Sequence, residues 1–169
     1  MIENSSLYSA LNNQKFHKAY TEFIVDQNYT HCLTLQWVQR PGYTKLMNDL
    51  RRLNMIWDRK LLGRTYNKSD IRTPAMYFVE GQPYVDMHVH ILLRLPESHW
   101  EKFEALFPEN QKKGVWKRIA PKGTYNLQRN NTAWDAAAYC TKDNHIWSDD
   151  VRRLFLSDDL ISSSSSVAR

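Results

Sequence analysis

Hydrophobic and polar residues recur along the chain with two periods, and each period predicts a kind of element. Residues 29–38, YTHCLTLQWV, alternate with a period of two and are rich in Thr, Leu and aromatic residues, which predicts a strand. Between Tyr43 and Leu62 apolar residues recur every three or four positions, which predicts an amphipathic helix. Its apolar stripe consists of Leu46, Leu50, Leu53, Trp57 and Leu61.

The middle of the chain predicts a β-hairpin. Residues 73–80, TPAMYFVE, and residues 85–95, VDMHVHILLRL, are strand-like, and the segment GQPY between them is typical of a turn. Pro96 ends the second of these strands, because proline cannot donate to a ladder of hydrogen bonds. We therefore expect the two strands to pair antiparallel.

The rest of the chain predicts two short helices separated by a turn-rich segment. Residues 97–107 predict a helix, with Ser98 as a candidate cap and Glu101 three residues later. Residues 111–131 are rich in turn residues and predict at most two short strands. Residues 132–145 predict a helix around three alanines. The order of elements predicts an α+β domain with a mostly antiparallel sheet flanked by helices.

Length and composition predict one domain and an intracellular protein. A chain of 169 residues can bury one core, so we expect a domain over residues 1–155 and a disordered, serine-rich tail over 156–169. The two cysteines, Cys32 and Cys140, have no metal-binding spacing and suit a reducing compartment. We expect no membrane span, since no stretch approaches about 18 apolar residues, and no signal peptide.

His88 and His90 are the first candidate site. They are two apart on a predicted strand, so both imidazoles project from one face while Val89 and Ile91 take the other. Two neutral imidazoles at this spacing can bind one metal ion, although such a pair can also be hydrogen-bonded within a sheet. A carboxylate from Glu80 or from Asp86 would complete a site that suits Mn²⁺ or Mg²⁺.

Tyr139 and Lys142 form the second candidate site. They are three apart on a predicted helix and therefore share a face, after a run of alanines that lets a bulky group approach. A tyrosine oxygen can act as a nucleophile, and the lysine can stabilise the charge that develops during attack at phosphorus. The alternative is a core tyrosine beside a surface lysine.

A basic stretch is the third candidate site. Residues 111–134 contain no Asp or Glu, and aromatic residues Trp116, Tyr125 and Trp134 are interleaved with the cations. Cations that contact phosphates and aromatic rings that stack on bases suit single-stranded nucleic acid, whereas the alternative is a solvated loop with core aromatics. The net charge of +5 favours the same class of partner. The cations are Lys112, Lys113, Lys117, Arg118, Lys122 and Arg129.

Three motifs in this order resemble those of the HUH endonuclease superfamily, and most closely its rolling-circle replication initiator (Rep) branch with one catalytic tyrosine. The motifs are a first strand with Leu33-Thr34-Leu35, a strand with His88-Val89-His90, and a helix with Tyr139-Cys140-Thr141-Lys142. The resemblance spans residues 29 to 145 and lies in the order of the motifs. In the eukaryotic viral members a glutamate on the strand before the histidine motif is the third metal ligand, and Glu80 has the matching position.

The resemblance implies a fold, a reaction and a partner. The fold would be an RRM-like antiparallel sheet with helices. Glu80, His88 and His90 would bind Mn²⁺ or Mg²⁺, and Tyr139 would attack single-stranded DNA at an origin or element end, leaving a 5′-phosphotyrosine link and a free 3′-OH. Lys142 would stabilise the developing charge. A helicase would be supplied by a longer protein or by the host, and the compartment would be the cytoplasm of a prokaryote or the nucleus for a eukaryotic virus.

Three other functions fit parts of the pattern. One is a single-strand transposase or a relaxase of the same superfamily. Another is a non-catalytic module that binds single-stranded nucleic acid, which would show no Mn²⁺-dependent nicking. The last is a metal phosphodiesterase that uses activated water, which would form no covalent intermediate and would tolerate loss of Tyr139.

Overall fold

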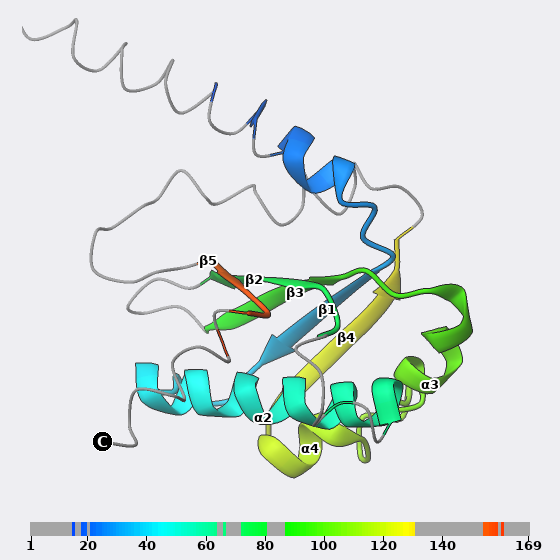
Figure 1. Ribbon diagram of the computed structural model, residues 1–169. Helices are drawn as coiled ribbons and strands as arrows, with labels where there is room; N and C mark the ends of the chain where they lie inside the picture. Colours follow the sequence, from blue (N-terminus) through cyan, green and yellow to red (C-terminus); the bar gives the residue numbers. More distant parts are fainter. Residues whose placement is uncertain are drawn as a thin grey trace, which may run out of the picture.

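The computed structural model describes residues 15, 18–19, 21–63, 66, 72–80, 87–130, 154–158 and 160 (Figure 1). The predicted helix over 132–145, which holds Tyr139 and Lys142, lies outside the described residues, as does Asp86. Of the predicted tail over 156–169 the structure describes 156–158 and 160, where Leu156 ends a strand and Leu160 is buried.

Five strands form one antiparallel sheet in the order β4-β1-β3-β2-β5. The predicted hairpin is confirmed, because β2 and β3 pair antiparallel. The chain order of β1, α2, β2, β3, further helices and β4 is a β-α-β-β-α-β arrangement. The predicted α+β class is therefore confirmed. The strands are β1 (His31–Gln36), β2 (Ala75–Glu80), β3 (His88–Leu93), β4 (Thr124–Arg129) and β5 (Leu154–Leu156).

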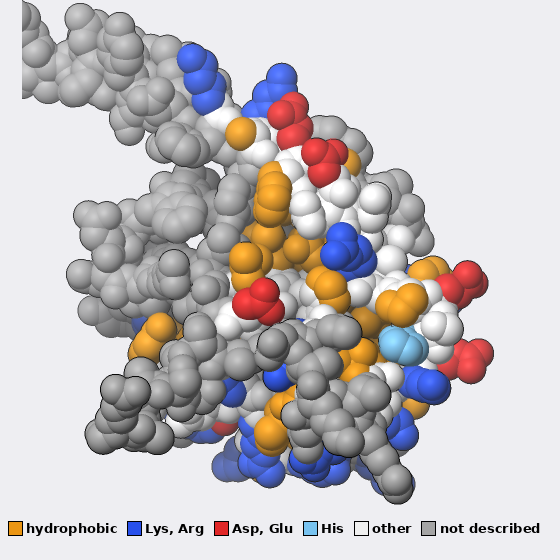
Figure 2. All heavy atoms as spheres, viewed as in Figure 1, with side chains coloured by type: hydrophobic (Ala, Val, Ile, Leu, Met, Phe, Trp, Pro, Cys, Tyr) orange, Lys and Arg blue, Asp and Glu red, His pale blue; other side chains and the backbone are white. Residues whose placement is uncertain are grey.

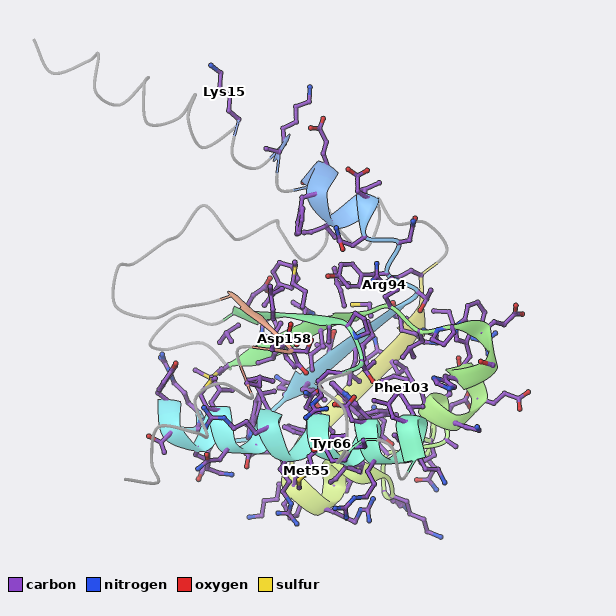
Figure 3. The ribbon with its side chains drawn as sticks, in the orientation of Figure 1. Lys15, Met55, Tyr66, Arg94, Phe103 and Asp158 are labelled. Atoms are coloured by element: carbon purple, nitrogen blue, oxygen red, sulfur yellow. The ribbon has the colours of Figure 1, made fainter. Side chains whose placement is uncertain are left out.

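The main core lies between the sheet and the helices, on what we call the helix face of the sheet (Figure 1). Alternate residues of the strands, such as Leu33, Val89 and Ile91, are fully buried there. Helix α2 (Tyr43–Leu62) has the predicted bounds and packs its whole predicted apolar stripe into this core. Phe103, labelled in Figure 3, joins the same core.

The segment after β3 differs from its prediction. Residues 97–107 form a short 3₁₀ helix, η2 (Glu97–His99), followed by α3 (Trp100–Glu104), which ends earlier than predicted. Neither helix has a side-chain cap, so the predicted capping by Ser98 is wrong. Pro96 precedes the 3₁₀ turn in an extended conformation, which is the backbone that proline favours.

The basic stretch folds into more than turns. It contains helix α4 (Val115–Ile119) and then β4. Helix α4 forms because Val115, Trp116 and Ile119 are all buried in the main core, so tertiary packing stabilises a helix too short to form alone. The segment, predicted to be turn-rich with up to two short strands, thus contains one strand, β4, and a helix, α4, that was not predicted.

The second face of the sheet, which we call the site face, carries a smaller apolar cluster. Met76, Phe78 and Leu92 are buried there against Ile24 and Tyr29. Residues 21–26 are helical and bring Ile24 onto the sheet, which the sequence did not predict. The described N-terminal residues therefore cover part of the site face.

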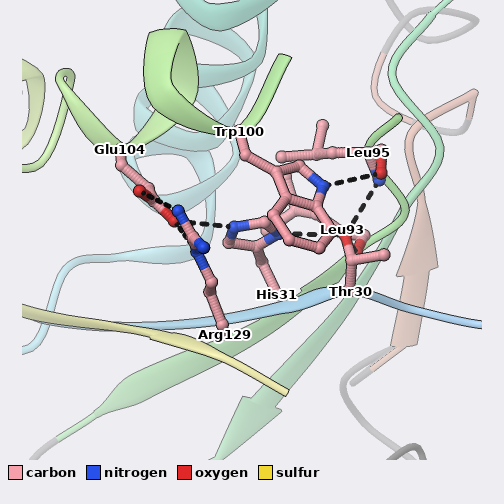
Figure 4. Close-up of polar contacts among 7 residues, drawn as sticks. All are labelled: Thr30, His31, Leu93, Leu95, Trp100, Glu104 and Arg129. Atoms are coloured by element: carbon pink, nitrogen blue, oxygen red, sulfur yellow. Dashed lines mark hydrogen bonds and ion pairs between the residues drawn. The ribbon is translucent and has the colours of Figure 1, made fainter. Parts of the chain in front are cut away.

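A polar network joins β1, α3 and β4 on the helix face (Figure 4). The fully buried His31 lies with its Nε2 3.2 Å from Glu104 Oε1, and its Nδ1 lies 2.9 Å from Thr30 Oγ1. Arg129 donates two hydrogen bonds to Glu104 and stacks over the Trp100 ring, 4.8 Å from its centroid. Arg129, a predicted DNA-binding residue, is thus already paired with a carboxylate.

Replacing Gly114 by alanine is expected to destabilise the fold. Gly114 has φ +109°, where a Cβ costs about 1–2 kcal/mol, and the added Cβ would lie 2.8 Å from the backbone oxygen of Leu106. Overpacking of that kind costs a further ~1–3 kcal/mol. Urea unfolding of Gly114→Ala should show this loss. The control Gly42→Ala, at the N-cap of α2 with φ −63° and no atom near the new Cβ, should lose only the capping preference of glycine over alanine, about 1 kcal/mol.

Candidate metal centre

Glu80, His88 and His90 come together at one end of the β2–β3 hairpin. The register places Glu80, the last residue of β2, directly opposite His88, the first residue of β3. Side chains of directly opposed residues lie on the same face of a sheet, and His90 shares that face by parity. The antiparallel pairing therefore gathers one carboxylate and two imidazoles on the site face.

The three side chains are in direct contact. Glu80 Oε2 lies 3.0 Å from His88 Nε2 and 3.3 Å from His90 Nε2. The two imidazole rings are edge to face, with centroids 4.9 Å apart. The His90 side chain is fully buried, Glu80 is 6% exposed and His88 is 27% exposed. The cluster thus reaches solvent mainly through His88.

The histidines keep Glu80 ionised. Burial acts to raise the pKa of this carboxyl, but hydrogen bonds from His88 and His90, together with their charges, outweigh it and lower the pKa to about 2. A carboxylate that is ionised at neutral pH and held against two imidazoles is a set of nitrogen and oxygen donors that divalent metals accept.

The cluster fits a metal ion on two counts. All three residues offer ligand atoms within 4.8 Å of one another. Donors about 2.1 Å from one ion, at angles near 90–110°, lie about 3.0–3.4 Å apart, which matches the separations of Glu80 Oε2 from the two imidazole nitrogens. In addition, the buried Oε1 of Glu80 has no hydrogen-bond partner among the described residues. The Glu80–His88–His90 group could therefore hold a metal ion.

Thr34 orients one of the imidazoles. Strand β1 pairs with β3 so that Thr34 lies opposite His90, and Thr34 Oγ1 is 2.9 Å from His90 Nδ1. In a metal-bound state Nδ1 would carry the proton and donate to this hydroxyl, which would leave the lone pair of Nε2 for the ion. The sequence placed Thr34 in a family motif but gave it no role, because the contact depends on the pairing of two strands far apart in the chain.

Replacing Thr34 by valine is expected to weaken metal binding about 10- to 100-fold, the usual effect of losing such an orienting partner. Valine has nearly the same shape and favours strands, but the buried Nδ1 of His90 loses this partner, so urea unfolding should show a loss of about 1–3 kcal/mol in a chain that still folds. Titration with Mn²⁺ would measure the affinity. Thr124→Val is the matched control, because Thr124 bonds to Gln36 and not to the cluster, and its affinity should equal that of the wild type.

An uncharged polar strip adjoins the cluster on the site face. Gln36 lies opposite His88 on β1, and Thr124 lies opposite Gln36 on β4. Asn126 and Gln128 follow on the same face of β4 and are exposed, as is Thr124. The strip offers hydrogen-bond donors and acceptors that carry no charge.

The basic residues occupy other places. Lys112, Lys113 and Arg118 are exposed on and before α4, in the helix layer on the far side of the sheet from the cluster. The aromatic residues Trp116 and Tyr125, predicted as candidates for base stacking, are buried in the main core. The alternative prediction of core aromatics therefore holds for these two, and Trp134 lies outside the described residues.

The other predicted site residues lie away from the cluster or outside the described residues. Lys117 donates to the backbone oxygen of Gly123 at 2.6 Å, and Lys122 is exposed in the turn before β4. Tyr139 and Lys142 lie outside the described residues, so their relation to the metal cluster stays a prediction. Asp86 lies outside them too, and Glu80 is the carboxylate found beside the two histidines.

Comparison of the chain with models of known protein families, with curated proteins and with solved structures gave no match. Among the described helices, none combines the length and apolar character that crossing a membrane requires. The sheet, the helices on one face and the His-His-Glu cluster on the other are compatible with an HUH-like fold.

Proposed function

We propose that this protein is a metal-dependent endonuclease that nicks and rejoins single-stranded DNA with a tyrosine nucleophile, as in rolling-circle replication initiators. The observation that carries the proposal is the Glu80–His88–His90 cluster, which lies on the sheet face opposite α2, α3 and α4. Its support from the sequence is the order of three motifs, in which Tyr-x-x-Lys, on a predicted helix, follows the histidine strand.

The residues of the cluster would hold Mn²⁺ or Mg²⁺. Such an ion, when bound, supplies a Lewis acid that polarises a phosphate ester. His90 is held in place by Thr34, and Glu80 stays ionised over the physiological range of pH. These partly buried side chains are therefore held in position before an ion binds, so metal binding should need little rearrangement of them.

The uncharged strip beside the cluster suits the substrate. A single strand crossing the sheet could hydrogen-bond through its bases and sugars to Gln36, Thr124 and Asn126. These amides and hydroxyls would hold the strand without competing with the phosphate for the metal site, because they carry no charge.

Tyr139 would form the covalent bond. Its phenolic oxygen would attack phosphorus, the bond from phosphorus to the 3′-oxygen would break, and that oxygen would leave as a 3′-OH after gaining a proton. Lys142, one helical turn away in the predicted helix, would neutralise charge on the phosphoryl oxygens. The free 3′-OH could prime synthesis, and attack by it on the phosphotyrosine would rejoin the strand.

Incubation with randomised, fluorescently labelled single-stranded oligonucleotides tests this function. With Mn²⁺ we expect cleaved DNA and a protein–DNA adduct that survives denaturing electrophoresis, and both should disappear with EDTA. Cleavage without an adduct would contradict a tyrosine nucleophile and favour activated water. Binding without cleavage in any divalent metal would contradict an enzyme and favour a binding module.

A further inference from the structure

The outer surface of α2 carries only positive charge. The helix contains two carboxylates, Asp49 and Asp58, and both are buried. Asp49 accepts a hydrogen bond of 2.9 Å from the Trp37 indole, and Asp58 accepts one of 3.0 Å from the Thr73 backbone. Because both acids point inward, the exposed charged side chains of α2 are all Lys or Arg.

The neighbouring helix α4 extends this positive surface. Residues 111–130 contain no acidic residue, and Lys112, Lys113 and Arg118 are exposed. Together with Gly114 and Lys117 they line a shallow depression. Helices α2 and α4 pack on each other over one core, and Figure 2 shows Lys and Arg side chains gathered along the lower side, where Figure 1 places both helices.

We call six of these residues the helix-layer cations: Arg52, Arg59, Lys60, Lys112, Lys113 and Arg118. All six are exposed, and none of them makes an ion pair within the described part of the chain. By contrast, Arg129 pairs with Glu104, and Lys45 pairs with Asp49. A group of unpaired like charges repels itself, and a polyanion relieves that repulsion.

Spacing and surroundings favour an extended polyanion without exposed bases. Arg52 and Arg59 are seven residues apart, which puts them on nearly one line of the helix and about 10 Å apart along it. A protein surface for single strands combines cations with stacking aromatics. Trp57 of α2 and Trp116 of α4 are fully buried, and among the described residues of these two helices the exposed aromatic residue is Tyr43, at the start of α2, so the layer offers mainly charge. That combination suits the phosphate backbone of a duplex.

We propose that the helix-layer cations form a docking surface for double-stranded DNA, on the side of the sheet opposite the metal cluster. The choice of DNA as the polyanion rests on the proposed function. The two faces of the sheet would then bind different parts of the DNA. The site face would act on a single strand, and the helix layer would hold an adjoining duplex. Contacts to phosphates alone would make this docking independent of sequence.

Fluorescence anisotropy with a labelled duplex of arbitrary sequence, measured at several salt concentrations, tests the surface. Two triple variants each remove three of the cations, and a control variant removes three exposed lysines elsewhere. The surface variants should bind at least about tenfold more weakly at 0.1 M salt, and the slope of log affinity against log salt should fall by about 2–3. The variants are Arg52→Gln/Arg59→Gln/Lys60→Gln and Lys112→Gln/Lys113→Gln/Arg118→Gln, and the control is Lys15→Gln/Lys18→Gln/Lys102→Gln.

Three results would contradict the proposed docking surface. Equal loss in the control and the surface variants would overturn it, because overall charge would then explain the binding. Duplex binding by wild type that is unchanged in both surface variants, or absent, would also overturn it. Binding of the wild type to vesicles that contain phosphatidylserine, without binding to the duplex, would overturn it as well. Metal-dependent cleavage of single strands tests the proposed function separately, and the surface variants should retain that cleavage.

Discussion

Replacement of Tyr139 by phenylalanine is expected to abolish the covalent protein–DNA adduct. The change removes only the phenolic oxygen, which the proposed reaction needs as the nucleophile, so no adduct should be detected by denaturing electrophoresis. Mn²⁺ affinity should be unchanged, because the three clustered ligand residues are untouched. That combination of results would separate loss of the nucleophile from loss of the metal site.

Tyr43→Phe is the matched control for that experiment. Tyr43 is 54% exposed at the start of α2, in the helix layer, so its hydroxyl has no part in the proposed chemistry. The control should form as much adduct as wild type. An adduct formed at the normal rate by Tyr139→Phe would show that another residue is the nucleophile.

Replacement of Glu80 by alanine is expected to lower the rate of metal-dependent cleavage by more than about 100-fold. Loss of a group that merely orients a ligand costs about 10- to 100-fold, and Glu80 itself would contact the metal. Among the described residues it contributes the carboxylate of the cluster, and it contacts both imidazoles. Cleavage of a labelled single strand at saturating Mn²⁺ would measure the rate.

Glu104→Ala is a demanding control for Glu80→Ala. Glu104 is also a carboxylate in contact with a histidine, His31, but it lies on the helix face of the sheet. Its replacement breaks the ion pair with Arg129 and should leave the cleavage rate within a few-fold of wild type. An equal loss in both variants would mean that Glu80 supports the fold and not the chemistry.

The elements that sequence predicted well are those whose signal is local. Helix α2 has its predicted bounds because a period of 3.6 residues runs unbroken from Leu46 to Leu61. The β2–β3 hairpin follows from two strand-like runs around one turn, and its register then places Glu80 opposite His88. For the same reason the parity of His88 and His90 was enough to put both rings on one face.

The elements that sequence missed depend on contacts far apart in the chain. Helix α4 is five residues long, and it is the burial of Trp116 under α2 that decides its conformation. Strand β5 exists through pairing with β2, about 80 residues earlier in the chain. The role of Thr34 likewise depends on β1 lying beside β3. In each case the deciding partner is invisible to a local window of sequence.

The basic stretch shows how a correct composition can suggest a wrong surface. Five of its six predicted DNA-binding cations are exposed and Lys117 is half-buried, but its aromatic residues Trp116 and Tyr125 supply core packing. The charge thus lies in the helix layer, away from the site face. Sequence alone could not assign the faces, because the segment was not predicted to contain a helix.

The metal cluster itself is the most direct place to test the central claim that Glu80, His88 and His90 hold a divalent ion. Isothermal titration calorimetry of the protein with Mn²⁺, in the absence of DNA, measures this binding directly. One ion per chain should bind to the wild type, and that binding should be lost in both Glu80→Ala and His90→Ala. A wild type that binds no Mn²⁺ or Mg²⁺, or variants that bind as tightly as wild type, would contradict the claim.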